Sequence, residues 1–322
     1  MSPGTMRPDT AQRDHGGGLD RAVALHGGTR QDWLDLSTGI NPVPYPVAPL
    51  PERLWRELPD SGSAEALEAA ARRFWRIPKE ACVLAAPGAS ALIARIPALA
   101  PPGRVAIPEP TYNEHLAAFR AQGWEWLPEL APGATAQVAV HPNNPTGRLW
   151  QADEIGAPLC VIDESFCDTC PDASLVGLAA RPGVIVLKSF GKFWGLAGLR
   201  LGFAIGERNH LRRLADLLGP WPVSGPAVAV ATAALDDCTW AETTRARLAR
   251  DSARLDALMN RHGARTLGGT TLFRLYEVAD AQTVQQRLAR HHVWSRIFPY
   301  SRSWIRLGLP GPEGWARLEA AL

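Results

Sequence analysis

The stretch SFGKFWGLAGLR, residues 189–200, directly follows the apolar run VIVLK, residues 184–188. It contains Lys192, one of only three lysines in a chain with 34 basic residues. Glycines flank Lys192, Ser189 precedes it by three residues and Arg200 follows it by eight. The apolar run predicts a buried strand, and the glycines predict a turn where that strand ends. We therefore expect Lys192 at the carboxyl end of a strand.

Short apolar runs of the same kind recur along the first two thirds of the chain. Six of them end in polar, Gly or Pro residues: ACVLAA (81–86), RVAIPEP (104–110), AQVAVHP (136–142), LCVIDES (159–165), VIVLKSF (184–190) and LRLGFAIG (199–206). Helical segments such as ALIARIPAL and TYNEHLAAFRAQG separate them. This alternation predicts an α/β fold with a mostly parallel sheet covered by helices on both faces. Ligands of such sheets bind at the carboxyl ends of the strands.

Other segments carry weaker structural signals. Residues 63–75, SAEALEAAARRFW, predict a helix with Ser63 as N-cap and with Leu67, Ala71 and Phe74 at helical spacing. A long helical stretch is expected from about residue 228 to 262. The tail predicts a small α+β domain with strands at 271–278, 293–298 and 303–309 and a helix at 281–292.

The composition is that of an ordinary globular protein and argues against several kinds of partner. The 322 residues are 46% hydrophobic and 20% charged, with a formal net charge of +2. No segment concentrates basic residues, so we expect no nucleic-acid or anionic membrane surface. We also expect neither a membrane-spanning segment nor a signal peptide. Five cysteines without regular spacing favour a reducing compartment, and the cytoplasm is the expected location.

Chemically useful residues follow several of the predicted strands. Residues 87–90, PGAS, offer N–H groups at the start of a helix, which suits a phosphate, although a tight turn explains them equally well. Tyr112 is either a packing residue or a ring that stacks on a flat ligand. Asn144 presents an amide at a strand end. Asp163 ends an apolar strand, where a buried carboxylate needs a partner.

One ligand accounts for all of these residues together. Pyridoxal phosphate (PLP) carries an aldehyde, a ring nitrogen, a phenolic oxygen and a phosphate. Lys192 would form the Schiff base, Asp163 would keep the ring nitrogen protonated, and Tyr112 would stack on the ring. Asn144 would donate to the phenolic oxygen, and no metal is expected. The expected phosphate contacts are Gly88, Ala89, Ser90, Ser189 and Arg200.

Three motifs in this order resemble a known family. HPNNPTG (141–147), VIDES (161–165) and SFGKFWGLAGLRLGF (189–203) are similar to the class I/II aminotransferases, which are PLP-dependent enzymes of fold type I. The resemblance extends from about Asn41 to Arg306. It implies a homodimer with the cofactor between the subunits and a chain in three parts. These are an amino-terminal segment (1–45) contributing to the active site and the small domain, a large PLP-binding domain (46–220) and a small carboxy-terminal domain (221–322).

The same resemblance selects one lysine. In the family, the Schiff-base lysine follows a serine by three residues and precedes the phosphate-binding arginine by eight. Lys192 satisfies both spacings, whereas Lys188 satisfies neither, and Lys79 lies in a surface-like segment. The resemblance therefore agrees with the assignment made from the strand ends.

A closer resemblance is to the threonine-phosphate decarboxylases of cobalamin biosynthesis. The stretches that carry it are DHGGGLDRAVALHGG (14–28), WLDLSTGINPVPYP (33–46), DESFCD (163–168) and VWSRIFPYSRSWIRLGLP (293–310). It implies decarboxylation of L-threonine O-3-phosphate to (R)-1-amino-2-propanol O-2-phosphate. Arg306 matches the arginine that binds the substrate carboxylate, and Arg296 matches one for the substrate phosphate. His15 and Asn41 are further substrate-binding candidates.

Two positions depart from the aminotransferase pattern. Aminotransferases usually have a tyrosine three residues after the ring-nitrogen aspartate, where this chain has Phe166. Asn144 would then contact the phenolic oxygen alone, and the pKa of the Schiff base should differ. A tyrosine that reaches the partner subunit's cofactor phosphate is replaced by Leu58. Both departures weigh slightly against transamination.

Other interpretations stay open. The motifs determine the cofactor better than the reaction, so an aminotransferase acting on a phosphorylated substrate such as histidinol phosphate is the alternative. A cofactor-sensing regulator of transcription is disfavoured, because no helix-turn-helix segment fits ahead of Asn41 and the chain is nearly neutral. Cys167 and Cys170 form a CxxC pair that could bind a metal or act in redox chemistry; two incidental thiols are favoured because no second CxxC is present.

Overall fold

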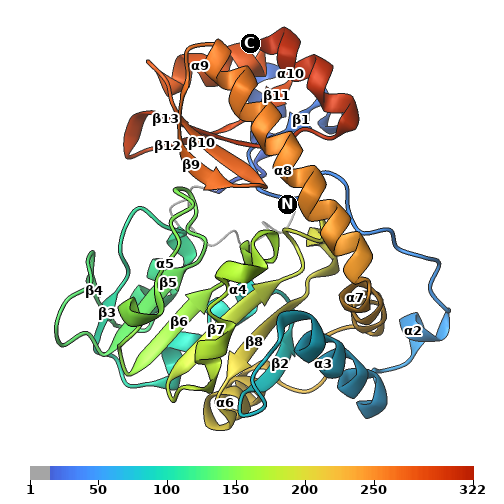
Figure 1. Ribbon diagram of the computed structural model, residues 1–322, viewed down its shortest axis with the longest axis vertical. Coiled ribbons are helices and arrows are strands. Elements are labelled where there is room, and N and C mark those ends of the chain that lie inside the picture. The colour runs from blue at the N-terminus through green and yellow to red at the C-terminus, as the bar shows by residue number, and fades with distance from the viewer. Residues whose placement is uncertain (1–14) are drawn as a thin grey trace, which may run out of the picture.

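The computed structural model describes residues 15–322. The first fourteen residues of the predicted amino-terminal segment lie outside the described residues. Figure 1 shows a larger lower part built on one sheet and a smaller upper part that contains the carboxyl end. Helix α8 (Cys238–Arg261) runs between the two parts. The cavity described below is lined by residues of both.

A seven-stranded sheet forms the lower part. Strand β8 is antiparallel to β7 and β2, and the remaining pairings are parallel. This arrangement confirms the predicted α/β fold with a mostly parallel sheet. In spatial order the strands are β2 (Cys82–Ala86), β8 (Gly202–Gly206), β7 (Val184–Ser189), β6 (Leu159–Asp163), β5 (Ala136–Val140), β3 (Arg104–Ala106) and β4 (Glu125–Leu127).

Helices cover both faces of this sheet because its strands are apolar on both faces. Along β7, Val184 and Val186 belong to one buried cluster, while Ile185 and Leu187 belong to another. The first cluster takes in α3 (Ser61–Trp75), α7 (Gly225–Asp236) and α8. The second takes in α4 (Ala89–Ile93), α5 (Asn113–Ala121) and α6 (Arg208–Leu218).

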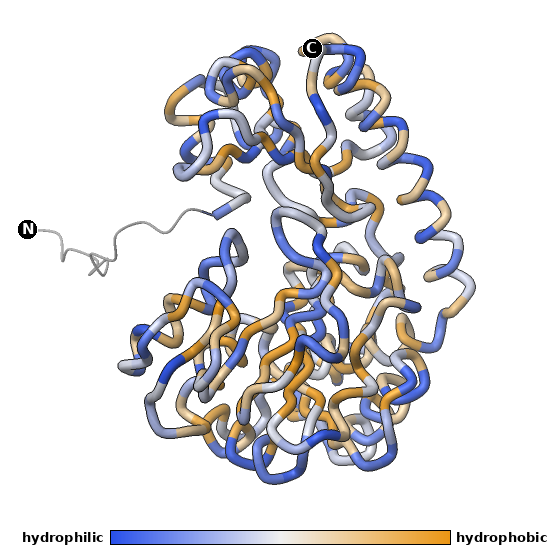
Figure 2. Tube along the Cα trace, turned by 60° about the vertical axis from the view of Figure 1, so that its left-hand side comes forward, coloured by the Kyte–Doolittle hydropathy of each residue, from blue (hydrophilic) through white to orange (hydrophobic). Residues whose placement is uncertain are grey.

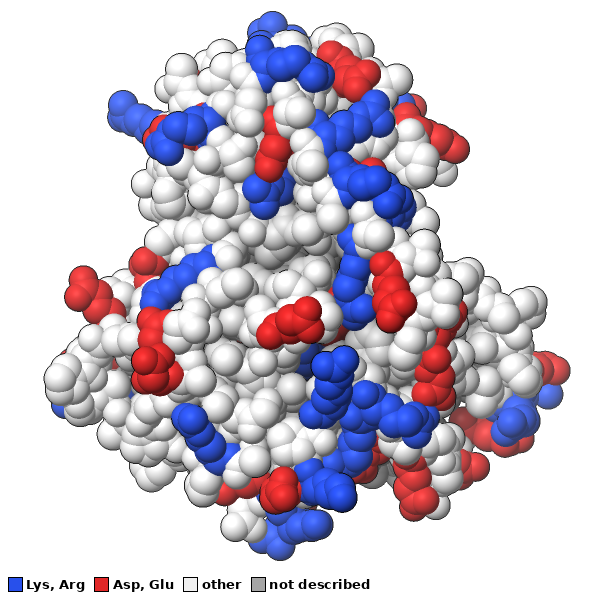
Figure 3. Space-filling model, in the orientation of Figure 1, with Lys and Arg blue, Asp and Glu red and all other residues white. Residues whose placement is uncertain are grey.

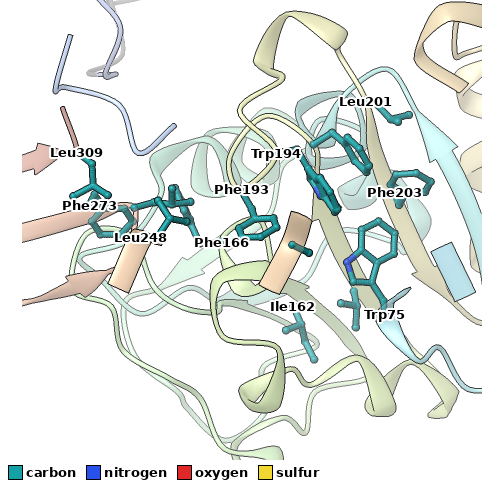
Figure 4. Packing of buried hydrophobic residues seen from close by; sticks show 14 of the residues in the cluster. Trp75, Ile162, Phe166, Phe193, Trp194, Leu201, Phe203, Leu248, Phe273 and Leu309 are labelled. Atoms are coloured by element: carbon teal, nitrogen blue, oxygen red, sulfur yellow. The ribbon is translucent and has the colours of Figure 1, made fainter. Parts of the chain in front are cut away.

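The first cluster is rich in aromatic side chains. Figure 4 shows Trp75, Trp194 and Phe203 gathered near one another, with the Trp75 and Phe203 ring centroids 5.0 Å apart. Further along the same core, Phe166 packs edge-on against Phe273 at 4.9 Å. Phe166 belongs to the lower part and Phe273 to the upper part. The core is therefore continuous between the two parts.

The upper part contains a second, antiparallel sheet. Its strands in spatial order are β12 (Arg296–Phe298), β13 (Ser301–Gly308), β10 (Phe273–Glu277) and β9 (Arg265–Thr270). A separate parallel pair joins β1 (Leu34–Asp35) to β11 (Val293–Trp294), so residues near the amino terminus lie beside the small sheet. The remaining helices are α1 (Leu19–His26), α2 (Arg53–Arg56), α9 (Ala281–Ala289) and α10 (Trp315–Ala321).

Two predicted helices differ from the structure. Helix α3 begins at Ser61 rather than Ser63, and its N-cap is Asp60, whose carboxylate accepts a hydrogen bond from the Ser63 N–H at 2.7 Å. The single long helix expected over residues 228–262 is two helices, α7 and α8, that separate at Asp237. The Asp237 side chain accepts a hydrogen bond from the Trp240 N–H at 2.9 Å and so starts α8 as a new helix.

The distribution of polarity agrees with this architecture. In Figure 2, hydrophobic residues concentrate inside the lower part, and hydrophilic residues dominate the outer turns. Figure 3 shows positive and negative side chains mixed over the visible face. No helix among residues 15–322 combines the length and hydropathy needed to cross a membrane.

Candidate active site

A cavity of about 430 Å³ opens where strands β5, β6 and β7 end. Val140, Asp163 and Ser189, the last residues of these strands, line it. It is also lined by side chains of the small sheet and by residues near the amino terminus. The structure brings together every predicted site residue except Asn41: His15, Gly88, Ala89, Ser90, Tyr112, Asn144, Asp163, Ser189, Lys192, Arg200, Arg296 and Arg306.

One end of the cavity is suited to an anion. Gly88 precedes α4 with a φ of 85°, and a side chain there would place its Cβ 2.8 Å from the Arg200 guanidinium. The Nη2 of Arg200 donates to the Ser90 hydroxyl at 3.1 Å. The Ser189 hydroxyl lies nearby in the cavity wall and accepts a hydrogen bond from the Gly191 N–H at 3.3 Å. A guanidinium, two hydroxyls and a bare backbone together form a cradle for a phosphate.

Asp163 is an almost completely buried carboxylate, with 2% of its surface exposed. Its Oδ1 accepts hydrogen bonds from the N–H and the hydroxyl of Ser165, at 3.0 and 2.6 Å. Its Oδ2 lies 2.8 Å from Nε2 of His115. Burial alone would raise the pKa of Asp163, but the contacts with His115 and Ser165 outweigh burial and lower it. The carboxylate is therefore held in its charged form.

Tyr112 immediately precedes α5 and lines the cavity. Burial raises the pKa of its hydroxyl to about 12, with a further contribution from the charge of Glu114. Its ring meets the ring of His115 at nearly a right angle, with the centroids 6.1 Å apart. Tyr112 therefore offers a neutral aromatic ring in the wall of the cavity.

Lys192 lies in the turn after β7 and lines the cavity. Burial, together with the positive charge of Arg306, lowers the pKa of its amine to about 8, against the opposing effect of Asp163. The amine lies 5.5 Å from the centre of the Phe166 ring. A lysine in this setting loses its proton close to neutral pH and becomes a nucleophile.

Arg306 and Arg296 lie opposite each other on the paired strands β13 and β12. Arg306 is 3% exposed and donates from Nη2 to the Ser37 carbonyl at 2.6 Å. Its Nη1 donates to Oδ1 of Asn144, and its guanidinium lies 4.9 Å from the Phe273 ring centre. Two cations on adjacent strands give this side of the cavity affinity for anionic groups.

The two remaining candidates for substrate binding, His15 and Asn41, differ in their position relative to the cavity. The imidazole of His15 lines the cavity and lies 2.9 Å from the Glu114 carboxylate. Asn41 does not line it: the Asn41 amide donates to the Phe193 carbonyl at 2.8 Å and accepts from Arg247 at 2.6 Å. These contacts fix the backbone beside Lys192, so this placement does not support the substrate contact predicted for Asn41.

The two departures from the aminotransferase pattern also differ in position. Phe166 lines the cavity, where its ring and that of Phe273 pack around Gly39. A Cβ at Gly39 would lie 2.8 Å from Phe273 and 2.9 Å from Phe166, so only glycine fits there. Leu58 is 65% exposed and is not part of the cavity wall. The wall beside Lys192 therefore carries the apolar Phe166 ring where aminotransferases usually have a tyrosine.

Sequence reasoning missed several residues of the site. His115 contacts Asp163 directly, Ser165 provides two of the hydrogen bonds to the same carboxylate, and Thr38 and Gly39 line the cavity. His115 follows Tyr112 by three residues at the start of a predicted helix, a spacing that places both on one face. That spacing was the available signal for His115. Thr38 and Gly39 lie in the stretch 33–46 that carries the closer resemblance, but neither was singled out, because they reach the cavity through long-range contacts.

The CxxC pair lies behind the cavity rather than in it. Cys167 is fully buried, and among the described residues its only cluster with metal-binding potential includes His141 and Glu164. That cluster already contains a cation, because the amine of Lys188 lies 2.6 Å from Glu164. Both ring nitrogens of His141 are engaged, by the Ala173 carbonyl and by the Trp150 N–H. The arrangement therefore does not offer a metal its usual free ligand atoms.

Comparisons with known proteins place the chain in a family. The family model described as aminotransferase class I and II matches residues 32–130 and 132–314. Threonine-phosphate decarboxylases from Sinorhizobium sp. and Pseudomonas aeruginosa are both 41% identical to this chain over 96% of its length and 97% of theirs. Histidinol-phosphate aminotransferase 2 from Rhizobium meliloti is 32% identical, over 64% of this chain and 62% of its own.

Solved structures share the fold at lower sequence identity. Histidinol-phosphate aminotransferase from Sinorhizobium meliloti, in complex with pyridoxal-5'-phosphate, superimposes with a TM-score of 0.79 at 19% identity, covering 100% of this chain and 97% of that one. L-threonine-O-3-phosphate decarboxylase from Porphyromonas gingivalis gives a TM-score of 0.71 at 19% identity, covering 89% and 97%. The chain belongs to the class I and II aminotransferase family, and within that family it groups with the threonine-phosphate decarboxylases.

Proposed function

We propose that this protein is a PLP-dependent decarboxylase that converts L-threonine O-3-phosphate to (R)-1-amino-2-propanol O-2-phosphate and CO₂ in cobalamin biosynthesis. The observation that carries the proposal is the cavity itself, which combines a lysine of lowered pKa, a buried ionised aspartate, a phosphate cradle and two arginines. The 41% identity to two threonine-phosphate decarboxylases over almost the whole chain supports the choice of reaction.

The residues of the cavity fit PLP. Lys192 would hold its aldehyde carbon covalently, and Asp163 would face its ring nitrogen. Its ring would lie against Tyr112, and its phenolic oxygen would receive the Asn144 amide, which Arg306 orients through a hydrogen bond to Oδ1. Its phosphate would lie in the cradle of Gly88, Ala89, Ser90, Ser189 and Arg200. Bound PLP supplies an electron sink for the pair of electrons left when CO₂ departs.

Side chains of the cavity would orient the substrate and return a proton to its Cα atom. A bidentate contact from Arg306 suits the substrate carboxylate, and burial of that guanidinium fixes the direction in which the carboxylate points. Arg296, which lies opposite Arg306 on the paired strand, and His15 would bind the substrate phosphate. Lys192, with its pKa lowered to about 8, is able to return a proton to Cα near neutral pH. The ring of Phe166, which packs against Phe273, would present an apolar surface to the substrate in this region.

The decisive experiment follows the carbon of the carboxylate. The purified protein, loaded with PLP, is incubated with carboxyl-labelled L-threonine O-3-phosphate in the absence of any 2-oxo acid. We expect labelled CO₂ and one equivalent of aminopropanol phosphate, and neither with the Lys192→Ala variant. The alternative is tested in parallel with histidinol phosphate and 2-oxoglutarate. Glutamate formation there, without CO₂ from threonine phosphate, would establish an aminotransferase instead.

We further propose that the protein is a homodimer. Near α2, Trp55 is 68% exposed and Leu58 is 65% exposed. Trp221, 59% exposed, precedes α7, whose first residue Gly225 lies against the Leu54 carbonyl of α2. Large apolar side chains exposed around one helix contact are typical of a surface that another subunit covers. Sedimentation equilibrium tests this: a monomer at micromolar concentration would contradict it.

A cytoplasmic location is also part of the proposal. All five cysteines of the chain are free thiols. Unpaired cysteines favour a reducing compartment such as the cytoplasm. Cell fractionation with an antibody against the protein is the direct test.

A further inference from the structure

The thiols of Cys167 and Cys170 have no part in the proposed reaction, and neither residue lines the cavity. The sequence alone favoured two incidental thiols. In the structure both lie in one short segment after β6, where Cys167–Thr169 form a single turn of 3₁₀ helix and Cys170 follows it. In a reducing compartment, neighbouring cysteines that react are typically transient redox groups rather than permanent disulfides. Their arrangement therefore decides whether this pair is able to react.

The turn brings the two cysteine side chains to the same side of the backbone. The Cys170 N–H donates to the Cys167 carbonyl at 2.9 Å, which closes the turn. Side chains three residues apart eclipse one another on a 3₁₀ helix, and the ends of such a turn have Cα atoms less than about 7 Å apart. A disulfide needs about 4.4–6.8 Å between the Cα atoms. The Cys167 Sγ also lies 3.8 Å from the Cys170 carbonyl oxygen. The backbone therefore already suits a bond between the two sulfurs.

The two thiols differ in access and in acidity. Cys167 is fully buried, whereas Cys170 is partly exposed. A hydrogen bond with Cys167 lowers the pKa of the Cys170 thiol against the effect of burial, and the Thr169 hydroxyl, 3.8 Å from the Cys170 sulfur, lowers it as well. The same contact between the thiols, together with burial, raises the pKa of Cys167. Cys170 is therefore the thiol that forms a thiolate and meets a reactant from solution.

We propose that Cys167 and Cys170 form a site of reversible oxidation that reacts with small-molecule disulfides such as glutathione disulfide. The Cys170 thiolate attacks one sulfur of the disulfide, and one glutathione leaves as a thiolate that takes up a proton from water. The Cys167 thiol then attacks the Cys170 sulfur of the mixed disulfide, and its proton passes to the second departing glutathione. Two protein thiols are oxidised to one disulfide, and one glutathione disulfide is reduced to two glutathiones.

The site lies between groups that already have roles in the molecule. Phe166, directly before Cys167, lines the cavity, and the carboxylate of Asp168, between the two cysteines, lies 3.6 Å from the amine of Lys188. Oxidation would close a covalent ring around the turn that carries Asp168. Neither thiol lines the cavity, so the inference is independent of the proposed decarboxylation.

The test uses the full-length, PLP-loaded protein in buffers that contain reduced and oxidised glutathione. After equilibration, free thiols are blocked with N-ethylmaleimide, and peptides are analysed by mass spectrometry without reduction. Cys170→Ser removes the attacking thiol, and Cys167→Ala removes the thiol that completes the disulfide. Cys238→Ser is the matched control, because it changes an exposed thiol far from the pair in the sequence. Circular dichroism identifies any variant that does not fold.

The wild type and Cys238→Ser should form the disulfide between Cys167 and Cys170. Its fraction should rise from about one tenth to about nine tenths over an about 80-fold change in the glutathione ratio (reduced concentration squared over oxidised), as a single two-electron equilibrium requires. Cys167→Ala should stop at the mixed disulfide, with one glutathione on Cys170. Cys170→Ser should form neither product, because the remaining thiol is buried.

Two results in the folded wild type would overturn the proposal. One is the absence of the internal disulfide even when glutathione disulfide dominates the buffer. The other is a glutathione that stays on Cys170, because the second step would then not occur. Should a variant not fold, the wild type decides alone, since formation of the disulfide and its reversal by reduced glutathione are both measured in the unaltered chain. None of these results bears on the assay for CO₂, so the two proposals fail separately.

Discussion

Lys188 and Lys192 lie four residues apart, before and after Ser189, yet the two regions around them have opposite electrostatics. The Lys188 amine lies 2.6 Å from the Glu164 carboxylate and 3.6 Å from the Asp168 carboxylate. These groups lie on the side of the sheet that α3 and α8 cover. Burial opposes its charge, but Glu164 and Asp168 raise the pKa of Lys188 above the ordinary lysine value. Burial, together with the positive charges of Arg306, Arg200 and Arg296, lowers the pKa of Lys192 to about 8, against the opposing effect of Asp163.

The difference teaches that the partners of a buried lysine decide whether it is structural or reactive. Asp168, the second partner of Lys188, is itself held by the indole N–H groups of Trp75 and Trp194, at 2.8 and 3.1 Å. Every charge in that region has a partner, so its lysine stays protonated and inert. In the cavity, burial and three arginines act against the charge of Lys192 while Asp163 alone favours it, so this lysine gives up its proton more readily.

Strand alternation separates the two environments. Successive residues of a strand point to opposite faces, so Lys188 faces the first core while Ser189 faces the cavity. Glu164 and Asp163 divide in the same way at the end of β6. At the ends of both β6 and β7, one of two successive residues therefore belongs to the buried ion cluster and the other lines the cavity.

The largest effect is expected on the cavity side. Lys192→Ala should lower turnover by about 10³-fold or more, because it removes both the covalent attachment of PLP and the proton carrier. The visible absorbance band of the protein–PLP Schiff base should disappear. Lys79→Ala, which changes an exposed lysine, serves as the control and should leave both unchanged. If the Lys192→Ala variant retained turnover, Lys192 would not be the residue to which PLP is covalently attached.

On the other face, Lys188→Met should affect stability rather than chemistry. It leaves Glu164 and Asp168 buried without their cation, which costs about 3–5 kcal/mol of the free energy of unfolding. Urea denaturation measures the loss. The double variant Lys188→Met/Glu164→Gln removes one of the stranded charges and should recover part of the stability. A single variant as stable as wild type would show that the ion cluster contributes nothing.

Arg306→Ala should alter the cavity lysine and substrate binding together. Removal of the buried guanidinium should raise KM about 30-fold or more, as loss of one partner of a buried charge pair does. The pKa of Lys192 should move up toward the ordinary lysine value, since Arg306 is the charge that lowers it most. Steady-state kinetics measures the first change. If KM is unchanged, the carboxylate is bound by another residue.

The smallest expected effect concerns the pH dependence of PLP loading. Only the neutral amine attacks the aldehyde, so the loading rate should rise with pH until the amine is deprotonated. For Lys192 the rise should level off above about pH 8, because its pKa is lowered to about 8. An unperturbed lysine would continue to gain until about pH 10.4. Stopped-flow absorbance of the cofactor-free protein measures the profile, and a rise that continues past pH 10 would contradict the lowered pKa.

Local patterns predicted the parts of the molecule that depend on nearby residues. The apolar runs predicted six of the seven strands in the large sheet, and strand β4, only three residues long, was missed. Through the resemblance to the aminotransferases, the spacing of Ser189, Lys192 and Arg200 distinguished the cavity lysine from Lys188. These features lie within one strand and the turn that follows it. Residues that are close in the sequence are also close in space there.

Features that depend on distant residues were not predictable in the same way. Asn41 faces Arg247, which lies 206 residues further along the chain. The ion cluster around Lys188 joins three segments through buried contacts that no periodicity reveals. Long-range packing, rather than propensity, determines each of these.

The most direct test of the comparison between the two lysines is chemical. The PLP-loaded protein is reduced with borohydride, digested and analysed by tandem mass spectrometry to locate the pyridoxyl group. The account predicts the group on Lys192 in stoichiometric amount, with Lys188 and Lys79 unmodified. Pyridoxyl on Lys188, or on no lysine of the chain, would contradict it.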